Sequence, residues 1–247
     1  MRRAPALQVH DLQVRRSRNF ALNVDSLWVD KGSVLCIAGA NGSGKTTLIE
    51  AIVGLTPYQG SIRIMGRPID LYPKQAKARL GYVPDDDQWF VPELTAAEYF
   101  ALLSSVYERS GVSIRAHMSK IVQHTADRLK FKAFDQQLGS LSHGNKKKVQ
   151  IIAALMHEPQ LVVVDELRNG LDPLAIRAAE QLFKSLSARG VAVVAATHDL
   201  WWAERFAAEI VMLDQGRVIL DAPTGTITAE SGSVEAKFLA LYGAARD

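Results

Sequence analysis

Short apolar runs alternate with stretches of helical periodicity along this chain. Residues 34–38, 161–164 and 191–196 are apolar throughout, and such uninterrupted runs are typical of parallel strands buried on both faces. Between the last two runs, Asp172-Pro173 opens a segment with a single apolar helical stripe, formed by Ile176, Ala179, Leu182, Phe183 and Leu186. The pattern predicts strand–helix–strand units with right-handed crossovers and therefore an α/β fold with a mostly parallel sheet.

Other segments have hydrophobic patterns that predict antiparallel strands or helices. The first forty residues and residues 60–69 alternate and contain turns, which predicts a small antiparallel sheet flanking the parallel one. Residues 92–158 are helical in pattern: Thr95 to Glu98 forms a capping box. Apolar positions then follow at helical spacing, at Ile114, Met118, Ile121, Val122, Thr125 and Leu129. Residues 210–220 predict a hairpin, and residues 234–242 a final helix.

These patterns predict one domain over residues 1–247, without an internal repeat or a low-complexity linker. We expect residues 1–91 and 159–230 to form the core with its antiparallel part. Residues 92–158 are expected to form an inserted helical subdomain, and residues 231–247 a C-terminal helix.

Composition and charge narrow the class of protein. The 247 residues are 48% hydrophobic and 22% charged, as in soluble globular chains. The longest apolar runs have six residues, too few to span a bilayer, and no secretory signal is visible, so we expect a cytosolic protein. The net charge of +3 is too small to indicate a nucleic-acid partner. The basic runs at 15–18 and 146–148 fit a solvated surface, and Cys36 fits a buried structural thiol.

A glycine-rich segment between a predicted strand and a predicted helix matches G-x-x-x-x-G-K-[ST]. Its residues are Gly39, Ala40, Asn41, Gly42, Ser43, Gly44, Lys45 and Thr46, with Thr47 following. Glycines let backbone N–H groups converge on phosphate oxygens, and the helix N-terminus adds positive potential. Lys45 is expected to reach the β- and γ-phosphates, and the Thr46 hydroxyl to ligate Mg²⁺.

Acidic and basic side chains follow two of the buried strands. Asp165 ends one strand and can deliver a carboxylate to Mg²⁺, since ligands of open α/β sheets bind at the carboxyl edge. Glu166 is then placed to orient or deprotonate an attacking water. His198 follows the next strand and can donate to a γ-phosphate from the same edge.

With these motifs the chain resembles the ATP-binding-cassette (ABC) transporter ATPases over nearly its whole length. Leu141-Ser142-His143-Gly144-Asn145 is similar to the family signature, Gly170-Leu171-Asp172 to the D-loop, and His198 to the switch histidine. The resemblance implies a P-loop ATPase fold that binds ATP and Mg²⁺. It also implies a dimer, of two identical or paralogous cassettes, in which Ser142 and Gly144 act on the nucleotide of the other subunit. Asp172 is implied as a further nucleotide-binding residue. Residues 141–148, 170–174 and 238–242 resemble exporters of the bacitracin and daunorubicin resistance type.

Three departures from the family pattern change the expected site. Asp85 stands where the Q-loop usually has Gln, and its carboxylate can serve Mg²⁺ or its waters. Arg16 stands where an aromatic residue usually stacks on adenine; a guanidinium can also stack on a base, and Phe20 is a second candidate. Leu167-Arg168 replaces the usual Pro-Thr, for which the sequence offers no physical reason.

The resemblance implies an ATP-hydrolysing subunit of an exporter, bound to a separate membrane permease on its cytoplasmic face. The permease is expected to dock near residues 85–100, where three aspartates precede Trp89-Phe90. A soluble ATPase acting as an assembly scaffold is an alternative, and so is a regulatory module with little hydrolysis. A P-loop small-molecule kinase is not favoured, because such an enzyme needs neither the signature nor the D-loop that this sequence contains.

Overall fold

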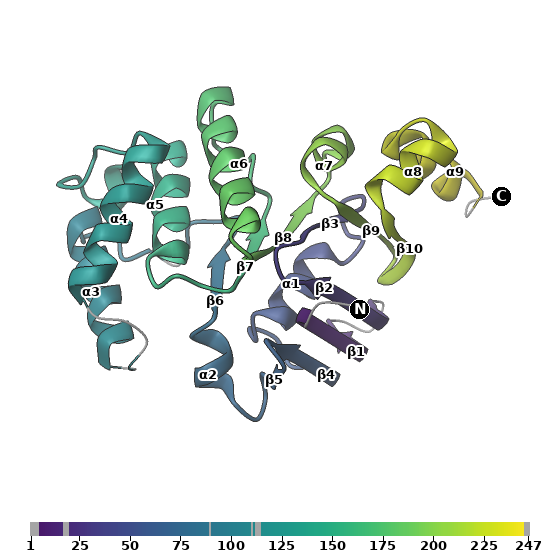
Figure 1. Ribbon diagram of the computed structural model, residues 1–247, viewed down its shortest axis with the longest axis horizontal. Coiled ribbons are helices and arrows are strands. Elements are labelled where there is room, and N and C mark those ends of the chain that lie inside the picture. The colour runs from purple at the N-terminus through teal and green to yellow at the C-terminus, as the bar shows by residue number, and fades with distance from the viewer. Residues whose placement is uncertain (1–4, 17–19, 89, 110, 112–114, 245–247) are drawn as a thin grey trace.

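The computed structural model describes residues 5–16, 20–88, 90–109, 111 and 115–244, with side chains to 242 (Figure 1). The predicted Ile114 and Trp89, and residues 17 and 18 of the first basic run, lie outside these ranges. Within them, ten strands form one sheet in the order β5-β4-β1-β2-β10-β9-β3-β8-β7-β6. The strands are β1 (Pro5–Arg15), β2 (Ala21–Asp30), β3 (Val34–Ala38), β4 (Gln59–Ile64), β5 (Arg67–Pro68), β6 (Leu80–Val83), β7 (Leu161–Asp165), β8 (Ala192–Thr197), β9 (Glu209–Asp214) and β10 (Arg217–Pro223).

Parallel and antiparallel strands share this one sheet. β3 pairs in parallel with β8 and β9, and β7 pairs in parallel with β6 and β8. β1 is antiparallel to β2 and β4, and β9 to β10, the predicted hairpin. β2 and β10 meet in parallel at Asn23 and Arg217, where the Asn23 amide donates to the Gly216 carbonyl at 2.7 Å. The antiparallel strands predicted at the N-terminus are therefore present, but they continue the parallel sheet.

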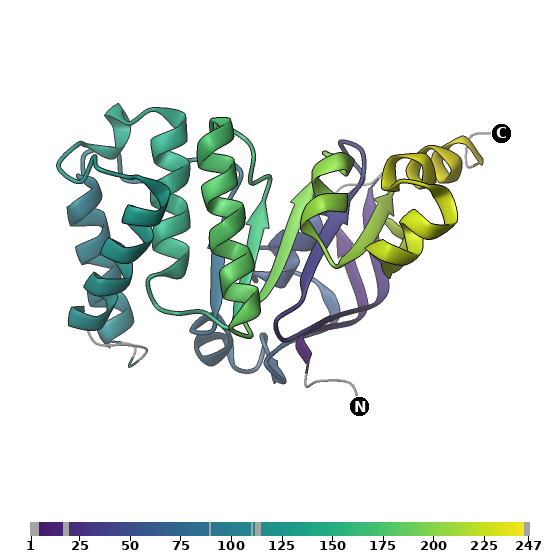
Figure 2. The same ribbon diagram turned by 45° about the horizontal axis from the view of Figure 1, so that its top comes forward.

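The helices lie around this sheet and beyond its end (Figures 1 and 2). They are α1 (Lys45–Ile52), α2 (Pro73–Lys77), α3 (Ala96–Arg109), α4 (Arg115–Leu129), α5 (His143–Leu155), α6 (Pro173–Ala188), α7 (Leu200–Phe206), α8 (Thr224–Ser231) and α9 (Val234–Ala244). Helices α3 to α5 lie beyond the β6 end of the sheet, and α8 and α9 lie at the opposite end of the molecule. The capping box of α3 is confirmed: the Thr95 amide donates to the Glu98 carboxylate, and the Glu98 amide donates to the Thr95 hydroxyl.

The central strand β3 shows why its sequence is apolar at every position. Consecutive side chains of a strand point to opposite faces. Val34, Cys36 and Ala38 belong to the apolar cluster that includes α4 to α7. Leu35 and Ile37 belong to the cluster with α1 and the antiparallel strands. Cys36 is fully buried, and burial raises the pKa of its thiol, which confirms its structural role.

Candidate functional site: a phosphate cradle at the carboxyl edge of the sheet

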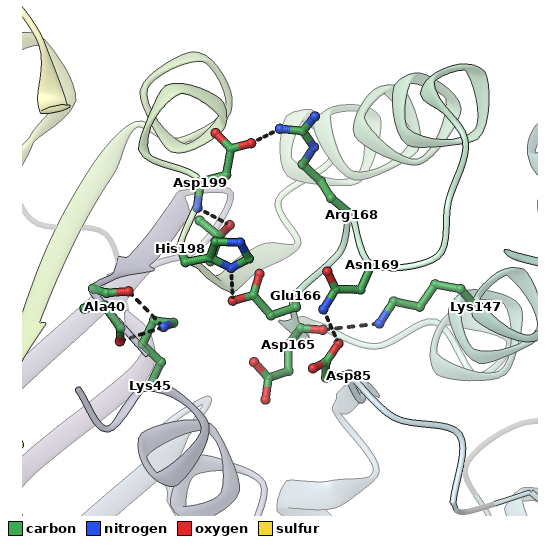
Figure 3. Close-up of polar contacts among 12 residues, drawn as sticks. Ala40, Lys45, Asp85, Lys147, Asp165, Glu166, Arg168, Asn169, His198 and Asp199 are labelled. Atoms are coloured by element: carbon green, nitrogen blue, oxygen red, sulfur yellow. Dashed lines mark hydrogen bonds and ion pairs between the residues drawn. The ribbon is translucent and has the colours of Figure 1, made fainter. Parts of the chain in front are cut away.

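The glycine-rich segment 39–46, the phosphate cradle, forms the turn from β3 into α1. Gly42 and Gly44 have φ angles of 81° and 111°, which L side chains rarely adopt, and a Cβ on Gly39 would lie 2.5 Å from the Leu213 carbonyl oxygen. Helix α1 begins at Lys45 without a side-chain cap, so its first amides remain available to a ligand. The Lys45 ammonium donates to the carbonyls of Gly39 and Ala40 at 2.9 and 3.2 Å, as Figure 3 shows.

The carboxylate of Asp165 faces this turn from the end of β7. Asp165 is 1% exposed, and within the described part of the chain its Oδ1 atom has no hydrogen-bond partner. Burial raises the pKa of Asp165 to about 6, opposed by a hydrogen bond from the Thr46 side chain. A buried acceptor without a partner, beside a hydroxyl, suits a hard divalent cation, which takes oxygen ligands. Asp165 and Thr46 therefore fit a Mg²⁺ ion shared with a phosphate.

Lys45 lies in the same electrostatic environment. Burial lowers the pKa of its ammonium, and the nearby carboxylates of Glu166 and Asp165 oppose that change. The ammonium therefore lies near the two acidic side chains at the end of β7, which is separated from β3 by β8. A phosphate that replaced the two loop carbonyls would give it stronger, charge-assisted hydrogen bonds.

Glu166 and His198 meet across the exits of β7 and β8. Glu166 has a φ of 48°, in the left-handed region, and its amide donates to the Ala196 carbonyl at 3.1 Å. The His198 Nδ1 atom lies 2.9 Å from the Glu166 Oε1 atom (Figure 3). The two predicted side chains are thus brought together at the edge that also carries Lys45.

A cavity of about 480 Å³ joins most of the predicted nucleotide-binding residues. Its lining consists of Arg16, Phe20, Asn41, Gly42, Gly44, Lys45, Thr46, Thr47, Asp85 and Glu166. Arg16 forms an ion pair with Glu50 of α1, so its guanidinium is held beside the cradle. The Asp85 Oδ1 atom accepts a hydrogen bond from the Asn169 side-chain amide at 2.7 Å. Asn169 was not among the predicted site residues.

The predicted signature and D-loop residues lie outside that lining. The Ser142 hydroxyl caps α5 by accepting from the Asn145 amide at 3.3 Å. The Asp172 carboxylate caps α6 by accepting from the amides of Leu174 and Ala175, both at 2.9 Å. A Cβ on Gly170 would overlap the ring of His143, so the signature loop packs directly on the D-loop of the same chain.

The expectation of a solvated surface for the run 146–148 is wrong for Lys147. This side chain is 2% exposed, and its ammonium donates to the carbonyls of Pro84 and Asp165 at 2.7 and 3.3 Å. Burial lowers its pKa to about 8, opposed by carboxylates that include Asp85 and Asp165. The physical reason is that α5 is buried on most of its surface, while consecutive helical residues point about 100° apart, so the lysine run does not stay on the exposed side.

Two neighbours of Lys147 on α5 also bind the loop of residues 84–87. Lys146 forms an ion pair with Asp87 at 2.7 Å, and the Gln150 side-chain amide donates to the Asp86 carbonyl at 2.5 Å. The interaction with Lys146 lowers the pKa of Asp87. The helix that follows the signature is thus joined to residues 84–87 by three polar contacts.

A glycine-rich turn between β3 and a helix, a lysine, and an acidic pair at the end of β7, on the far side of β8, define a nucleotide-binding site of the P-loop class. A family model described as ABC transporter matches residues 22–169. Nod factor export ATP-binding protein I of Paraburkholderia xenovorans (strain LB400) is 32% identical over 224 residues, covering 89% of this chain and 72% of that protein. The chain therefore belongs to the ABC transporter family, as an ATP-binding subunit and ATPase.

Solved structures agree with this assignment. One described as the ATP binding subunit of an ABC transporter has a TM-score of 0.86 and 29% identity, covering 96% of this chain and 99% of that one. The structure of cbiO1 from Clostridium perfringens, described as part of the ABC transporter complex cbiONQ, has a TM-score of 0.76 and 26% identity, covering 92% of each chain. The predicted family and fold class are confirmed. Among the described residues, no helix has the length and apolar character needed to cross a bilayer.

Proposed function

We propose that this chain is the ATP-hydrolysing subunit of an exporter and drives a separate membrane permease from the cytoplasmic side. The observation that carries the proposal is the meeting of Lys45, Asp165, Glu166 and His198 at one sheet edge, beside a cavity lined by the cradle. The relatives named as Nod factor export proteins support transport out of the cell.

Nucleotide binding rests on groups that are already in place. The amides at the start of α1 bind phosphate oxygens, and Lys45 exchanges its two loop carbonyls for the β- and γ-phosphates. Arg16 or Phe20 covers the base, since both line the cavity. Thr46, Asp165 and Asp85 would hold Mg²⁺, which would neutralise charge on the phosphate oxygens.

Hydrolysis is assigned to the pair at the exits of β7 and β8. The Glu166 carboxylate orients a water and takes its proton, while His198 leaves Glu166 and donates a hydrogen bond to the γ-phosphate. Because the Glu166 side chain is only 12% exposed, its carboxylate has little competing solvent around it. Its backbone bond to Ala196 keeps that carboxylate at the sheet edge.

The signature acts on a second cassette in this proposal. Ser142, Gly144 and Asp172 are absent from the lining of the cavity of their own chain, as a role on the partner's nucleotide requires. A second copy or a paralogous subunit supplies the other half. Two-fold pairing then makes two equivalent ATP sites in one self-complementary interface.

A groove between the core and the helical segment is the proposed seat of the permease. It measures about 940 Å³ and is lined by residues of α2, α3 and neighbouring segments, among them Pro73, Lys77, Leu103 and Tyr107. An adjoining cavity of about 210 Å³ is lined by Leu55, Tyr82, Pro84, Phe90, Tyr99, Gln150 and Ala153. Phe90 lies there as expected, whereas the carboxylates of Asp85 and Asp87 already have partners within the chain. In this proposal the permease therefore binds mainly through contacts with the apolar residues that line this cavity.

The variant Glu166→Gln tests the assignment of the base. It removes the acceptor of the proton and keeps the shape of the side chain, so we expect ATP turnover to fall by at least about 100-fold with ATP affinity within a few-fold of wild type. We also expect ATP to trap a dimer, seen by size-exclusion chromatography with light scattering. Glu230→Gln, which alters an exposed ion pair near the C-terminus, is the control and should leave turnover unchanged.

Measurements on the same purified proteins distinguish the transporter subunit from the regulatory module and the soluble scaffold. Undiminished hydrolysis in Glu166→Gln would refute the role of that carboxylate. A background rate for the wild type, measured together with its permease, would favour the regulatory module. A stable complex with soluble proteins and no association with membranes after fractionation would favour the scaffold.

A further inference from the structure

Two non-covalent contacts join the loops that carry Glu166 and His198. One is the contact between these two side chains at 2.9 Å. The other is an ion pair between the Arg168 guanidinium and the Asp199 carboxylate. Figure 3 shows Arg168 and Asp199 on the far side of His198 from the Asp85 carboxylate, so the ion pair spans the two loops where they leave the sheet.

Asp199 is fixed by three separate contacts. Its backbone amide donates to the Thr197 hydroxyl at 3.0 Å, and its Oδ1 atom accepts from the Trp202 amide at 2.8 Å, which caps α7. Its Oδ2 atom accepts from Arg168. His198 is the preceding residue, so the backbone that aims its ring is held from one side by β8 and from the other by Asp199.

Arg168 is anchored to the turn that begins at Glu166. The Leu171 amide donates to the Arg168 carbonyl at 3.3 Å, and the Asn169 side chain binds Asp85. The neighbouring Leu167 is 1% exposed and packs in the core, so the turn is held while the Arg168 side chain reaches outward. The guanidinium therefore connects a well-anchored turn to the loop of His198.

The Arg168 and Asp199 side chains are 37% and 30% exposed, and an ion pair open to solvent to this extent adds little to global stability. Its geometric effect can be large, because a displacement of about 1 Å in a reacting group can lower a rate by about 100-fold. The position of the pair beside His198 therefore favours a role in placing that side chain over a role in folding.

We propose that Arg168 and Asp199 form a positioning pair that sets the place of His198 relative to Glu166. The inference rests on the proposed roles of those two residues in ATP hydrolysis. It also gives a physical reason for an arginine at a position where the sequence offers none. Neither residue needs to touch the nucleotide, since the pair acts through the backbone next to His198.

The variants Arg168→Met and Asp199→Asn test the pair. Asparagine keeps an oxygen that can cap α7, and methionine keeps the length of the side chain, so both remove mainly the ion pair. We expect kcat to fall about tenfold in each, with KM for ATP within about twofold and an unchanged melting temperature. The double variant should be no slower than either single one. Arg168→Lys should recover part of the rate.

Lys237→Met is the matched control, because it removes an exposed ion pair with Glu230 that lies far along the chain from the site. It should leave kcat unchanged. Wild-type kcat in both site variants would overturn the proposal. A fall in kcat that only follows a fall in melting temperature would overturn it as well, as would strictly multiplicative effects in the double variant.

A second readout does not depend on turnover. The imidazole signals of His198, assigned with His198→Gln in ¹H–¹⁵N spectra, should shift in Arg168→Met and Asp199→Asn and stay in place in Lys237→Met. Unshifted signals in both site variants would refute the positioning role. If the wild type hydrolysed no ATP, the proposed function would fail, while these spectra would still decide whether the pair places His198.

Discussion

His157 is a buried imidazole whose protonation should weaken the fold. It follows α5 and is 4% exposed, and its Nε2 atom lies 3.1 Å from the Leu80 carbonyl oxygen of β6. Its ring stacks on Tyr107 with 4.3 Å between the centroids. Within the described residues its buried Nδ1 atom has no hydrogen-bond partner. A neutral ring with its proton on Nε2 fits this site, whereas a second proton on Nδ1 would be buried without an acceptor.

The size of the effect follows from the pKa of the ring. Burial lowers the pKa of His157 from 6.5 to about 4, opposed by the hydrogen bond to Leu80. Because the folded pKa lies below the unfolded one, the unfolded chain binds more protons between these values. The stability is therefore complete above pH 6.5 and falls as the pH drops toward 4. At 1.36 kcal/mol per pH unit, the full loss is about 3 kcal/mol.

Asp165 acts in the opposite direction in part of the same range. Burial raises its pKa from 3.8 to about 6, so the folded chain binds the proton first and gains stability as the pH falls below 6. The two effects partly cancel in the wild type. The contribution of His157 therefore has to be measured as a difference between two proteins that share Asp165.

The measurement compares the wild type with His157→Gln by urea unfolding at pH 7.0 and 4.5. Glutamine can donate to Leu80 from a similar position and does not titrate. Relative to the wild type, the free energy of unfolding of the variant should rise by about 2 kcal/mol between the two pH values. His124→Gln, on the exposed side of α4, is the control and should follow the wild type. Parallel curves for wild type and His157→Gln would refute the reasoning.

Two further predictions concern the packing of α5. Lys147→Met removes a buried ammonium but frees two carbonyls, so the free energy of unfolding should change by less than about 2 kcal/mol, while ATP turnover falls about tenfold because α5 loses its link to Pro84 and Asp165. Urea unfolding measures the free energy of unfolding and a steady-state assay measures ATP turnover, with Lys148→Met as the control. A large loss of stability with full ATP turnover would contradict the prediction for Lys147→Met. Gly81→Ala should cost about 2 kcal/mol by urea unfolding, because its Cβ would overlap the Ala154 carbonyl and force β6 from α5. Gly225→Ala, whose Cβ meets open space within α8, should not lower the free energy of unfolding, and equal stability of both variants would contradict the prediction.

The sequence predicts the parts of this site that depend on neighbouring residues. The cradle is a continuous strand–turn–helix segment, so its motif and its structure coincide at Lys45 and Thr46. Asp165, Glu166 and His198 could be placed because parallel strands end at the same sheet edge. The strand alternation did not show that β2 would join β10, since this contact rests on a single pair of residues far apart in the chain.

Contacts between distant side chains could not be predicted in the same way. Arg168 and Asp199 are 31 residues apart, and their pairing depends on the spacing of two loops that no local pattern reports. Asn169 and Asp85 are 84 residues apart and meet only because β6 lies beside β7. Lys147 is a third case: the lysine run was expected on a solvated surface, and the buried contacts of Lys147 with Pro84 and Asp165 join it to residues 63 and 18 positions away.

The proposed permease groove and the proposed base share one loop. Pro84 and Gln150 line the cavity that adjoins the groove, and Gln150 also holds the backbone of residue 86. In the same loop, the Asp85 carboxylate accepts from the Asn169 side-chain amide, and the backbone amide of Asn169 donates to the Glu166 carbonyl at 3.3 Å. A partner that fills the cavity must press on the residues that also hold the turn of Glu166. Since packed interiors transmit displacement, docking and the position of this carboxylate should depend on each other.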